Sequence, residues 1–151
     1  MTVADVQLRA ITDEDREAVC ALRVHPDQER FVATVPESLR DAAAAPEEHP
    51  WYRAVYCAGE PVGFVMLAEP PGGPCTLWRL LVDERHQGRG IGRAVLARVA
   101  DRVRAHGATA LLTSCVPGPG SPQPFYERLG FAPTGEVDDG EVVLRLPLPP
   151  G

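Results

Sequence analysis

Three glycines alternate with larger residues in a short stretch past the middle of the 151-residue chain, Gln87-Gly88-Arg89-Gly90-Ile91-Gly92-Arg93. The stretch follows the apolar run Leu80-Leu81-Val82 and opens a long amphipathic segment. Glycines permit positive φ and let the backbone come close to a ligand. The first N–H groups of a helix lack internal partners and lie at its positive end. Because Arg89 and Arg93 add positive charge that suits a pyrophosphate, the stretch predicts a phosphate-binding turn.

Two familiar phosphate loops do not fit these residues. A Walker loop ends in Gly-Lys-Ser/Thr, and the chain contains no lysine. A dinucleotide fingerprint needs Gly-x-Gly-x-x-Gly after the first strand of a βαβ unit, whereas this turn lies past mid-chain with a different spacing. A glycine-rich turn without a ligand remains the alternative interpretation.

Charge and composition limit the classes of partner. The formal net charge is −6, from 15 basic residues, all arginine, and 21 acidic residues. This balance argues against a nucleic-acid surface, which needs clustered positive charge, and leaves room for a small cationic substrate. Mild acidity that only aids solubility is the alternative. No apolar run reaches the roughly 18 residues of a membrane-spanning helix, so we expect no membrane partner.

Four cysteines, Cys20, Cys57, Cys75 and Cys115, lie far apart without a Cys-x-x-Cys pair or a histidine at zinc-ligand spacing. We therefore expect no metal site and packed thiols rather than disulfides. The N-terminus does not resemble a signal peptide, which favours the cytoplasm. The length predicts a single domain over residues 1–151.

Alternating or dense apolar residues predict seven strands, and the run after the long helix is apolar enough to be buried on both faces. The segment 59–60 is expected to be a hairpin turn. The strands are predicted at 6–11, 51–58, 62–68, 76–82, 110–115, 131–137 and 141–146.

Four helices are predicted between these strands. Thr12 is expected to cap the first, which has Val19 and Leu22 on its apolar face, and the second covers 38–45 after Pro36. The long helix covers 90–106, with Val95, Val99 and Val103 inward, and ends at Gly107. Ser121 is expected to cap a short helix with Pro122 at its first position and Gly130 after its end.

The pattern Gln87-x-x-Gly90-x-Gly92 resembles the acyl-CoA pyrophosphate loop of the GNAT superfamily of N-acetyltransferases. The run Phe125-Tyr126-Glu127-Arg128-Leu129-Gly130-Phe131 resembles that superfamily's short fourth helix. The element order β-α-α-β-β-β-α-β-α-β-β agrees with both. The resemblance implies an α/β (α+β) GNAT fold, with a central mixed sheet of six to seven strands flanked by four helices.

Shorter runs resemble bacterial spermine/spermidine acetyltransferases: 29–33, 62–66 and 78–83. This resemblance implies an acetyl-CoA-dependent N-acetyltransferase acting on a small cationic amine, a polyamine such as spermidine or spermine. Other amines, such as an amino acid, an aminoglycoside or a peptide N-terminus, remain alternatives, as does a non-catalytic acyl-CoA-binding module. The resemblance also allows a homodimer, although no residue pattern requires one.

The resemblance assigns roles within the cofactor site. Tyr126 would donate a proton to the CoA sulfur, the N–H near Leu81 would bind the thioester oxygen, and Val82 would pair with the pantetheine amides. The loop residues Gln87, Gly88, Arg89, Gly90, Ile91, Gly92 and Arg93 would hold the pyrophosphate. Pro119 and Pro122 replace an Asn and an Ala found in many relatives, and Ser121 is the candidate to take over the lost amide contact.

The amine must lose a proton before it attacks, because a lysine-like amine has a pKa near 10.4. Glu29, Glu69 and Glu84 are candidates for the base, and Glu29 and Glu69 are the principal ones. The acids Asp27, Glu29 and Glu37, with Trp51, could form an anionic and aromatic trough for a polyamine. Arg79, in an otherwise apolar strand, either binds a substrate carboxylate or faces solvent at the strand end.

Overall fold

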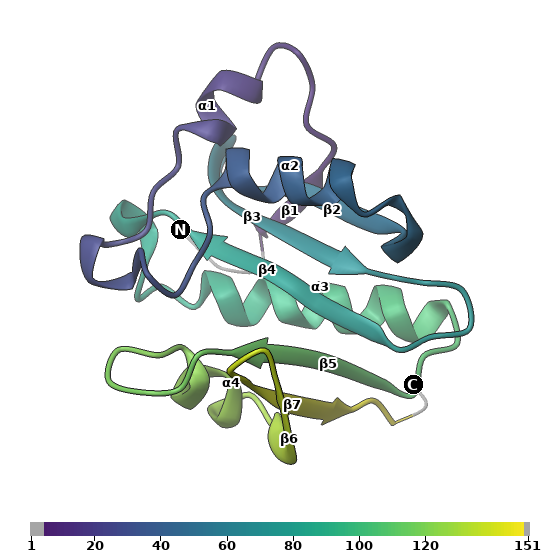
Figure 1. Cartoon of the computed structure of the whole chain (residues 1–151). Helices are drawn as coiled ribbons and strands as arrows, with labels where there is room; N and C mark the ends of the chain where they lie inside the picture. The colour runs from purple at the N-terminus through teal and green to yellow at the C-terminus, as the bar shows by residue number, and fades with distance from the viewer. Residues whose placement is uncertain (1–4, 150–151) are drawn as a thin grey trace.

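The computed structural model describes residues 5–149, which form one seven-stranded sheet in the order β1-β2-β3-β4-β5-β7-β6 (Figure 1). Each neighbouring pair is antiparallel except β4 and β5, which run parallel. The predicted mixed sheet, element order and four α-helices are confirmed. The strands are β1 (Gln7–Arg9), β2 (Pro50–Cys57), β3 (Glu60–Ala68), β4 (Cys75–Val82), β5 (Ala110–Cys115), β6 (Ala132–Asp138) and β7 (Glu141–Pro147).

Helices cover both faces of the sheet. α1 (Arg16–Cys20) and α2 (Val35–Ala44) lie on one face, where Val19 and Val35 pack against Phe64 and Met66 of β3. On the other face lie α3 (Ile91–Ala105) and α4 (Gln123–Arg128). As predicted, α3 buries one apolar stripe, which consists of Ile91, Val95, Leu96, Val99 and Val103. Within residues 5–149 no helix has both the length and the apolar character that a bilayer crossing requires.

The starts of three helices differ from the prediction. Thr12 does not cap α1, because its N–H and hydroxyl both donate to the Asp15 carboxylate and the helix begins at Arg16. α2 begins at Val35 rather than at residue 38, because Thr34 and Glu37 form a capping box and proline is tolerated in the first turn. Pro122 is the residue before α4, not its first residue.

Three strand features also differ from the prediction. The turn between β2 and β3 is Ala58-Gly59, and both residues have positive φ, as a type I′ hairpin requires. β5 is not buried on both faces, because Ser114 is exposed while Leu111, Thr113 and Cys115 are buried. Trp78 forms a bulge in β4, so that Arg79 pairs with Met66 but Leu77 pairs with Leu67.

The parallel strands β4 and β5 separate soon after they begin. They pair only where Cys75–Leu77 faces Leu111–Thr113. Beyond Leu77, β4 continues for five residues beside β3 alone, so the sheet opens towards the carboxyl end of β4. Figure 1 shows this opening between β4 and β5, with the predicted glycine turn and the start of α3 beside it.

Candidate active site

The glycine turn has the geometry that the sequence predicts at two of its three glycines. Gly88 and Gly90 have φ of +77° and +79°, in the left-handed region. Gly90 precedes α3, and the first helical bond runs from the Ala94 N–H to the Gly90 carbonyl at 3.1 Å. The preceding N–H groups at 91–93 therefore have no partner within the helix. They are available to phosphate oxygens at the positive end of a 15-residue helix.

Gly92 does not have the positive φ that the sequence suggested for all three glycines. It lies within α3 and has helical φ, so conformational freedom does not explain it. A Cβ at this position would lie 2.9 Å from the ring of Phe125 on α4. Gly92 therefore allows α3 and α4 to pack closely, which places Tyr126 next to the turn.

A cleft of about 510 Å³ connects the turn with the opening of the sheet. The crossover between α1 and α2, the end of β4, the glycine turn and the segment around α4 each form part of its wall. Its lining residues are Val24, Gln28, Phe31, Val32, Leu80, Val82, His86, Gln87, Gly88, Gly90, Ile91, Gly92, Arg93, Gly120, Ser121, Pro122, Pro124, Phe125, Tyr126 and Arg128.

The register of β4 determines which backbone amides face this cleft. The Asp83 N–H donates to the Val62 carbonyl of β3 at 2.9 Å. Because alternate residues of an antiparallel strand bond to the same neighbour, the Leu81 N–H also points at β3. The N–H groups of Leu80 and Val82 point the other way, into the cleft. An oxyanion donor near Leu81 would therefore be the N–H of Leu80 or of Val82.

Tyr126 lies in a nearly closed apolar position on α4. Its side chain is 8% exposed, and the rings of Phe125 and Phe131 meet it edge-on at 5.3 Å and 5.5 Å. Burial raises the pKa of Tyr126 well above its usual value, Cys115 adds to this, and a hydrogen bond with Thr113 opposes it. The phenol therefore stays protonated at neutral pH and can donate a proton.

Three hydrogen bonds hold the Pro/Gly-rich loop before α4. The Ser121 hydroxyl accepts from the Gln123 N–H at 3.2 Å, and the Ser121 N–H donates to Gly118. The Pro119 carbonyl accepts from the Arg30 guanidinium at 3.0 Å. Ser121 lines the cleft, but it is not the predicted N-cap of α4, because Pro122 holds that position without a side-chain capping bond.

A second hollow, of about 330 Å³, lies on the α1–α2 face of β4 and contains two acids. Glu29 and Glu37 line it together with Leu81, and it shares Val24 and Val32 with the cleft. Hydrogen bonds from the Thr34 N–H and hydroxyl hold the pKa of Glu37 below its usual value, with Arg40 and Arg79 contributing charge. The acids predicted for a trough therefore adjoin the cleft, and Asp27 lines a further hollow beside Glu29.

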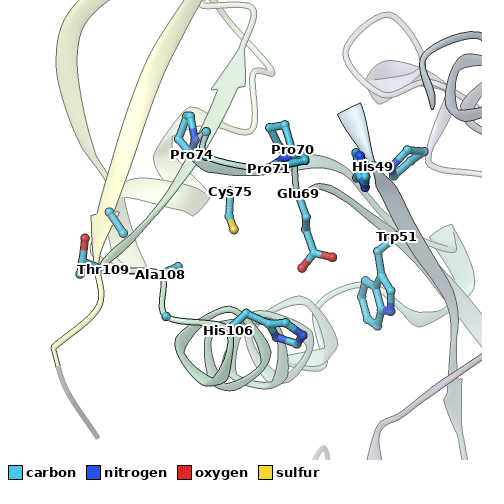
Figure 2. A pocket seen from close by; sticks show the side chains of 15 residues that line it. His49, Trp51, Glu69, Pro70, Pro71, Pro74, Cys75, His106, Ala108 and Thr109 are labelled. Carbon is cyan, nitrogen blue, oxygen red and sulfur yellow. The ribbon is translucent and has the colours of Figure 1, made fainter. Parts of the chain in front are cut away.

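Glu69 and Trp51 are not part of this arrangement. They line a hollow of about 730 Å³ with Cys75 and His106, at the end of the sheet where β4 begins (Figure 2). Glu69 is held by the Arg102 guanidinium at 2.8 Å, and Arg102 also lies 4.1 Å from the Trp51 ring. Glu69 is therefore already paired, and neither residue lines the cleft, which lies at the other end of β4.

Three other predicted residues also lie outside the cleft. Arg79 points to α2 and forms a 2.6 Å ion pair with Asp41, so its charge is paired within the chain. Glu84 is exposed, and its N–H donates to the Arg23 carbonyl. Arg89 of the glycine turn is exposed as well.

Two functional contacts were not found from the sequence. The Gln87 side-chain amide donates to the Val82 carbonyl at 2.9 Å and to the Gln28 side chain at 2.8 Å. The buried carboxylate of Asp83 accepts from the backbone N–H groups of Arg23 and Arg85 and from the Arg85 guanidinium. The sequence did offer a signal for Asp83, because an acid there follows an apolar strand. It offered no signal that Gln28 would make this contact.

The donors of the cleft suit an acyl-CoA. The N–H groups at 91–93, which have no partner within α3, suit the phosphates of the cofactor. The strand amides of Leu80 and Val82 suit its pantetheine arm, and Tyr126 lines the same cleft. Within residues 5–149 no group of three or more His, Cys, Asp or Glu side chains could hold a metal ion.

Comparison with known proteins gives a consistent result. Residues 8–131 match the model of the Acetyltransferase (GNAT) family. A spermine/spermidine N(1)-acetyltransferase of Bacillus subtilis is 29% identical over 150 residues, which cover 92% of this chain and 96% of that protein. An acetyltransferase structure from Thermus thermophilus superposes with a TM-score of 0.76 at 24% identity, covering 98% of this chain and 100% of that one. PaiA N-acetyltransferase from Thermoplasma acidophilum, solved with coenzyme A, superposes with a TM-score of 0.68 at 15% identity, covering 94% and 98%.

Proposed function

The chain belongs to the acetyltransferase (GNAT) family and is an N-acetyltransferase that uses an acyl-CoA, and from this premise we propose that it acetylates a primary amine of a polyamine such as spermidine or spermine. One observation carries the choice of acceptor: the hollow of Glu29 and Glu37 adjoins the cofactor cleft, and Val24 and Val32 line both. Carboxylates beside the cleft would hold the distant ammonium groups of a polycation while one amine enters.

Acetyl-CoA supplies an activated carbonyl group when it is bound. The Leu80 N–H would bind the carbonyl oxygen as it becomes anionic, and removal of one such donor typically costs about 100-fold or more in rate. The Val82 N–H, two residues further along the strand, would bind the pantetheine arm. Tyr126 would give its proton to the sulfur as the carbon–sulfur bond breaks. The protein's contribution is thus to position the reactants, bind the oxyanion and supply this proton.

The amine must lose a proton before its nitrogen attacks. Of the three glutamates considered, Glu29 alone lines the hollow that adjoins the cleft, so we assign it the proton, received directly or through water. We do not assign this role to Glu69, because it pairs with Arg102 at the far end of the sheet.

The proposal places the enzyme in the cytoplasm, on the ground that all four cysteines are free thiols. A homodimer remains a prediction of the family resemblance, and sedimentation of the purified protein would test it.

Release of free thiol from acetyl-CoA tests the function directly. The purified protein is assayed with spermidine, spermine, diamines, amino acids and aminoglycosides, each in turn. We expect release with the polyamines, and mass spectrometry should show one added acetyl group on the amine. Release with another acceptor alone would reject the polyamine while keeping the enzyme class. Acetyl-CoA binding without release on any amine would favour the non-catalytic module.

A further inference from the structure

The crossover between α1 and α2 spans the opening between β4 and β5 (Figure 1). On the β4 side, Gln28 accepts a hydrogen bond from Gln87 of the glycine turn at 2.8 Å. On the β5 side, Arg30 donates to the carbonyl of Pro119, which lies 89 residues further along the chain, at 3.0 Å. The crossover is therefore attached to both edges of the cleft.

The crossover places the large side chain of Phe31 in the wall of the cleft. It lines the cleft and is half-buried, although it belongs to an irregular segment. A Cβ on Gly120 would lie 3.2 Å from Cε2 of the Phe31 ring, so the loop before α4 touches the ring. The Arg30 guanidinium covers the ring at 4.5 Å from its centre. Because Arg30 and Gly120 both contact it, the Phe31 ring is held in place as part of the cleft wall.

The ring lies beside the boundary of the cleft. Phe31 and Gly120 line the cleft, while Arg30, Pro119 and Gly120 line an outer hollow of about 560 Å³. Because Gly120 lines both spaces and touches the ring, removal of the ring would enlarge the cleft at this boundary.

We propose that Phe31 determines which acyl group the enzyme transfers, by limiting its length to acetyl. The proposal rests on the proposed function, because it takes the thioester to lie where the Leu80 amide and Tyr126 meet. The phosphate end of the cleft is at the glycine turn, so a group carried beyond the sulfur meets the apolar side chains of the crossover. There, each further methylene must displace a ring that Arg30 and Gly120 hold in place, and such overpacking is unfavourable.

A series of acetyl-, propionyl-, butyryl- and hexanoyl-CoA donors with one accepted amine tests the proposal. In the wild-type enzyme, kcat/KM should fall by about 10-fold or more between acetyl- and butyryl-CoA, the scale on which a pocket discriminates methylene groups. Phe31→Ala should reduce that acetyl preference by about 10-fold or more, and Phe31→Leu should reduce it less. Val137→Ala removes an apolar side chain that is 68% exposed and should leave the preference unchanged.

Two results would overturn the proposal: a wild-type enzyme that uses hexanoyl-CoA as well as acetyl-CoA, or an unchanged preference in a folded Phe31→Ala protein. Should Phe31→Ala not fold, as judged by its thermal melt, Phe31→Leu provides the same comparison. If no amine is accepted at all, the proposed function fails, but calorimetric Kd values for acetyl- and butyryl-CoA still test the wall. An unchanged Kd ratio in the variant would then reject it.

Discussion

The side-chain amide of Gln87 in the cofactor turn donates to the side-chain oxygen of Gln28 in the acceptor-side crossover, at 2.8 Å and across 59 residues of sequence. The same amide donates to the Val82 carbonyl at the end of β4. One residue of the turn thus connects the strand that would bind the thioester with the segment that contains Glu29. The proposed cofactor and acceptor sites would therefore share a hydrogen bond.

We predict that loss of this bond affects both substrates. Gln28→Leu should raise KM for acetyl-CoA and for the amine by about 5-fold each, because a hydrogen bond of this kind contributes about 1 kcal/mol. Gln87→Leu should have a similar effect, and the double variant should cost less than the sum, since the two changes remove one shared interaction. Gln7→Leu, on the distant strand β1, is the control. Strict additivity would show that the pair is not coupled.

Tyr126→Phe should lower kcat by about 100-fold while Kd for acetyl-CoA changes little, because only proton donation to the sulfur is lost. Tyr52→Phe, which removes a hydroxyl on β2, should retain wild-type kcat. The raised pKa of Tyr126 also has a consequence for pH dependence. The phenol stays protonated beyond pH 10, so no loss of activity on the alkaline side below that pH should come from Tyr126. Wild-type turnover in Tyr126→Phe would reject its role as the acid.

Asp83→Asn should destabilise the protein at neutral pH by about 1.5–3 kcal/mol, the range for hydrogen bonds to a charged group. Burial alone would raise the pKa of Asp83, but hydrogen bonds from Arg85 and from the Arg23 N–H hold it below the usual 3.8. A lowered folded pKa gives stability that is complete above the unfolded pKa and is lost as the pH falls through the folded pKa.

Urea unfolding of the Asp83→Asn variant at a series of pH values gives the measurement. The difference in the free energy of unfolding from wild type should be largest above about pH 5 and should shrink below about pH 4, where the carboxyl becomes protonated. Asp138→Asn, an exposed acid next to the β6–β7 turn, should give no such difference. A gap between wild type and variant that persists at low pH would exclude the ionised carboxylate as its cause.

The sequence predicted the positions of most elements, because strand alternation and turn glycines are local signals. It did not predict which atoms of β4 face the cleft. Two features decide this: the bulge at Trp78, and the bond from the Asp83 N–H to Val62, which fixes which alternate amides of β4 point at β3. Both depend on the pairing with β3, which is a tertiary property. The sequence alone therefore could not say that the Leu81 N–H points at β3 while the N–H groups of its neighbours point into the cleft.

The placement of Glu69 and Trp51 could have been better predicted. In an antiparallel hairpin, the start of β2 lies beside the end of β3, and Trp51 does pair with Leu67. Both residues must then lie where β4 begins, opposite the glycine turn that follows Val82. By contrast, the contact of Phe31 with Gly120 could not be predicted, because it joins two irregular segments.

Gly92→Ala should destabilise the protein, although alanine is usually the better helix former by about 0.5–1 kcal/mol. The new Cβ would lie 2.9 Å from the Phe125 ring, and such overpacking typically costs about 1–3 kcal/mol. Because Phe125 adjoins Tyr126, kcat should also fall. Phe125→Leu in the same chain should restore much of the stability, as measured by thermal unfolding. A Gly92→Ala protein as stable as wild type would mean that α3 and α4 have room between them.

Matched neutralisation of Glu29 and Glu69 separates the two principal candidates for the base. Glu29→Gln should raise KM for a polyamine by about 10-fold and lower kcat, because it removes a carboxylate from the hollow beside the cleft, and general bases typically contribute 100-fold or more. Glu69→Gln should leave both constants near wild type and reduce only stability, by about 1 kcal/mol, since it loosens the half-buried pair with Arg102. Steady-state kinetics with spermidine, alongside a thermal melt of each variant, measures both effects. The opposite pattern, in which Glu69→Gln abolishes activity and Glu29→Gln has no effect, would contradict the assignment of Glu29. The acceptor would then have to enter from the hollow of Trp51, at the end of the sheet where β4 begins.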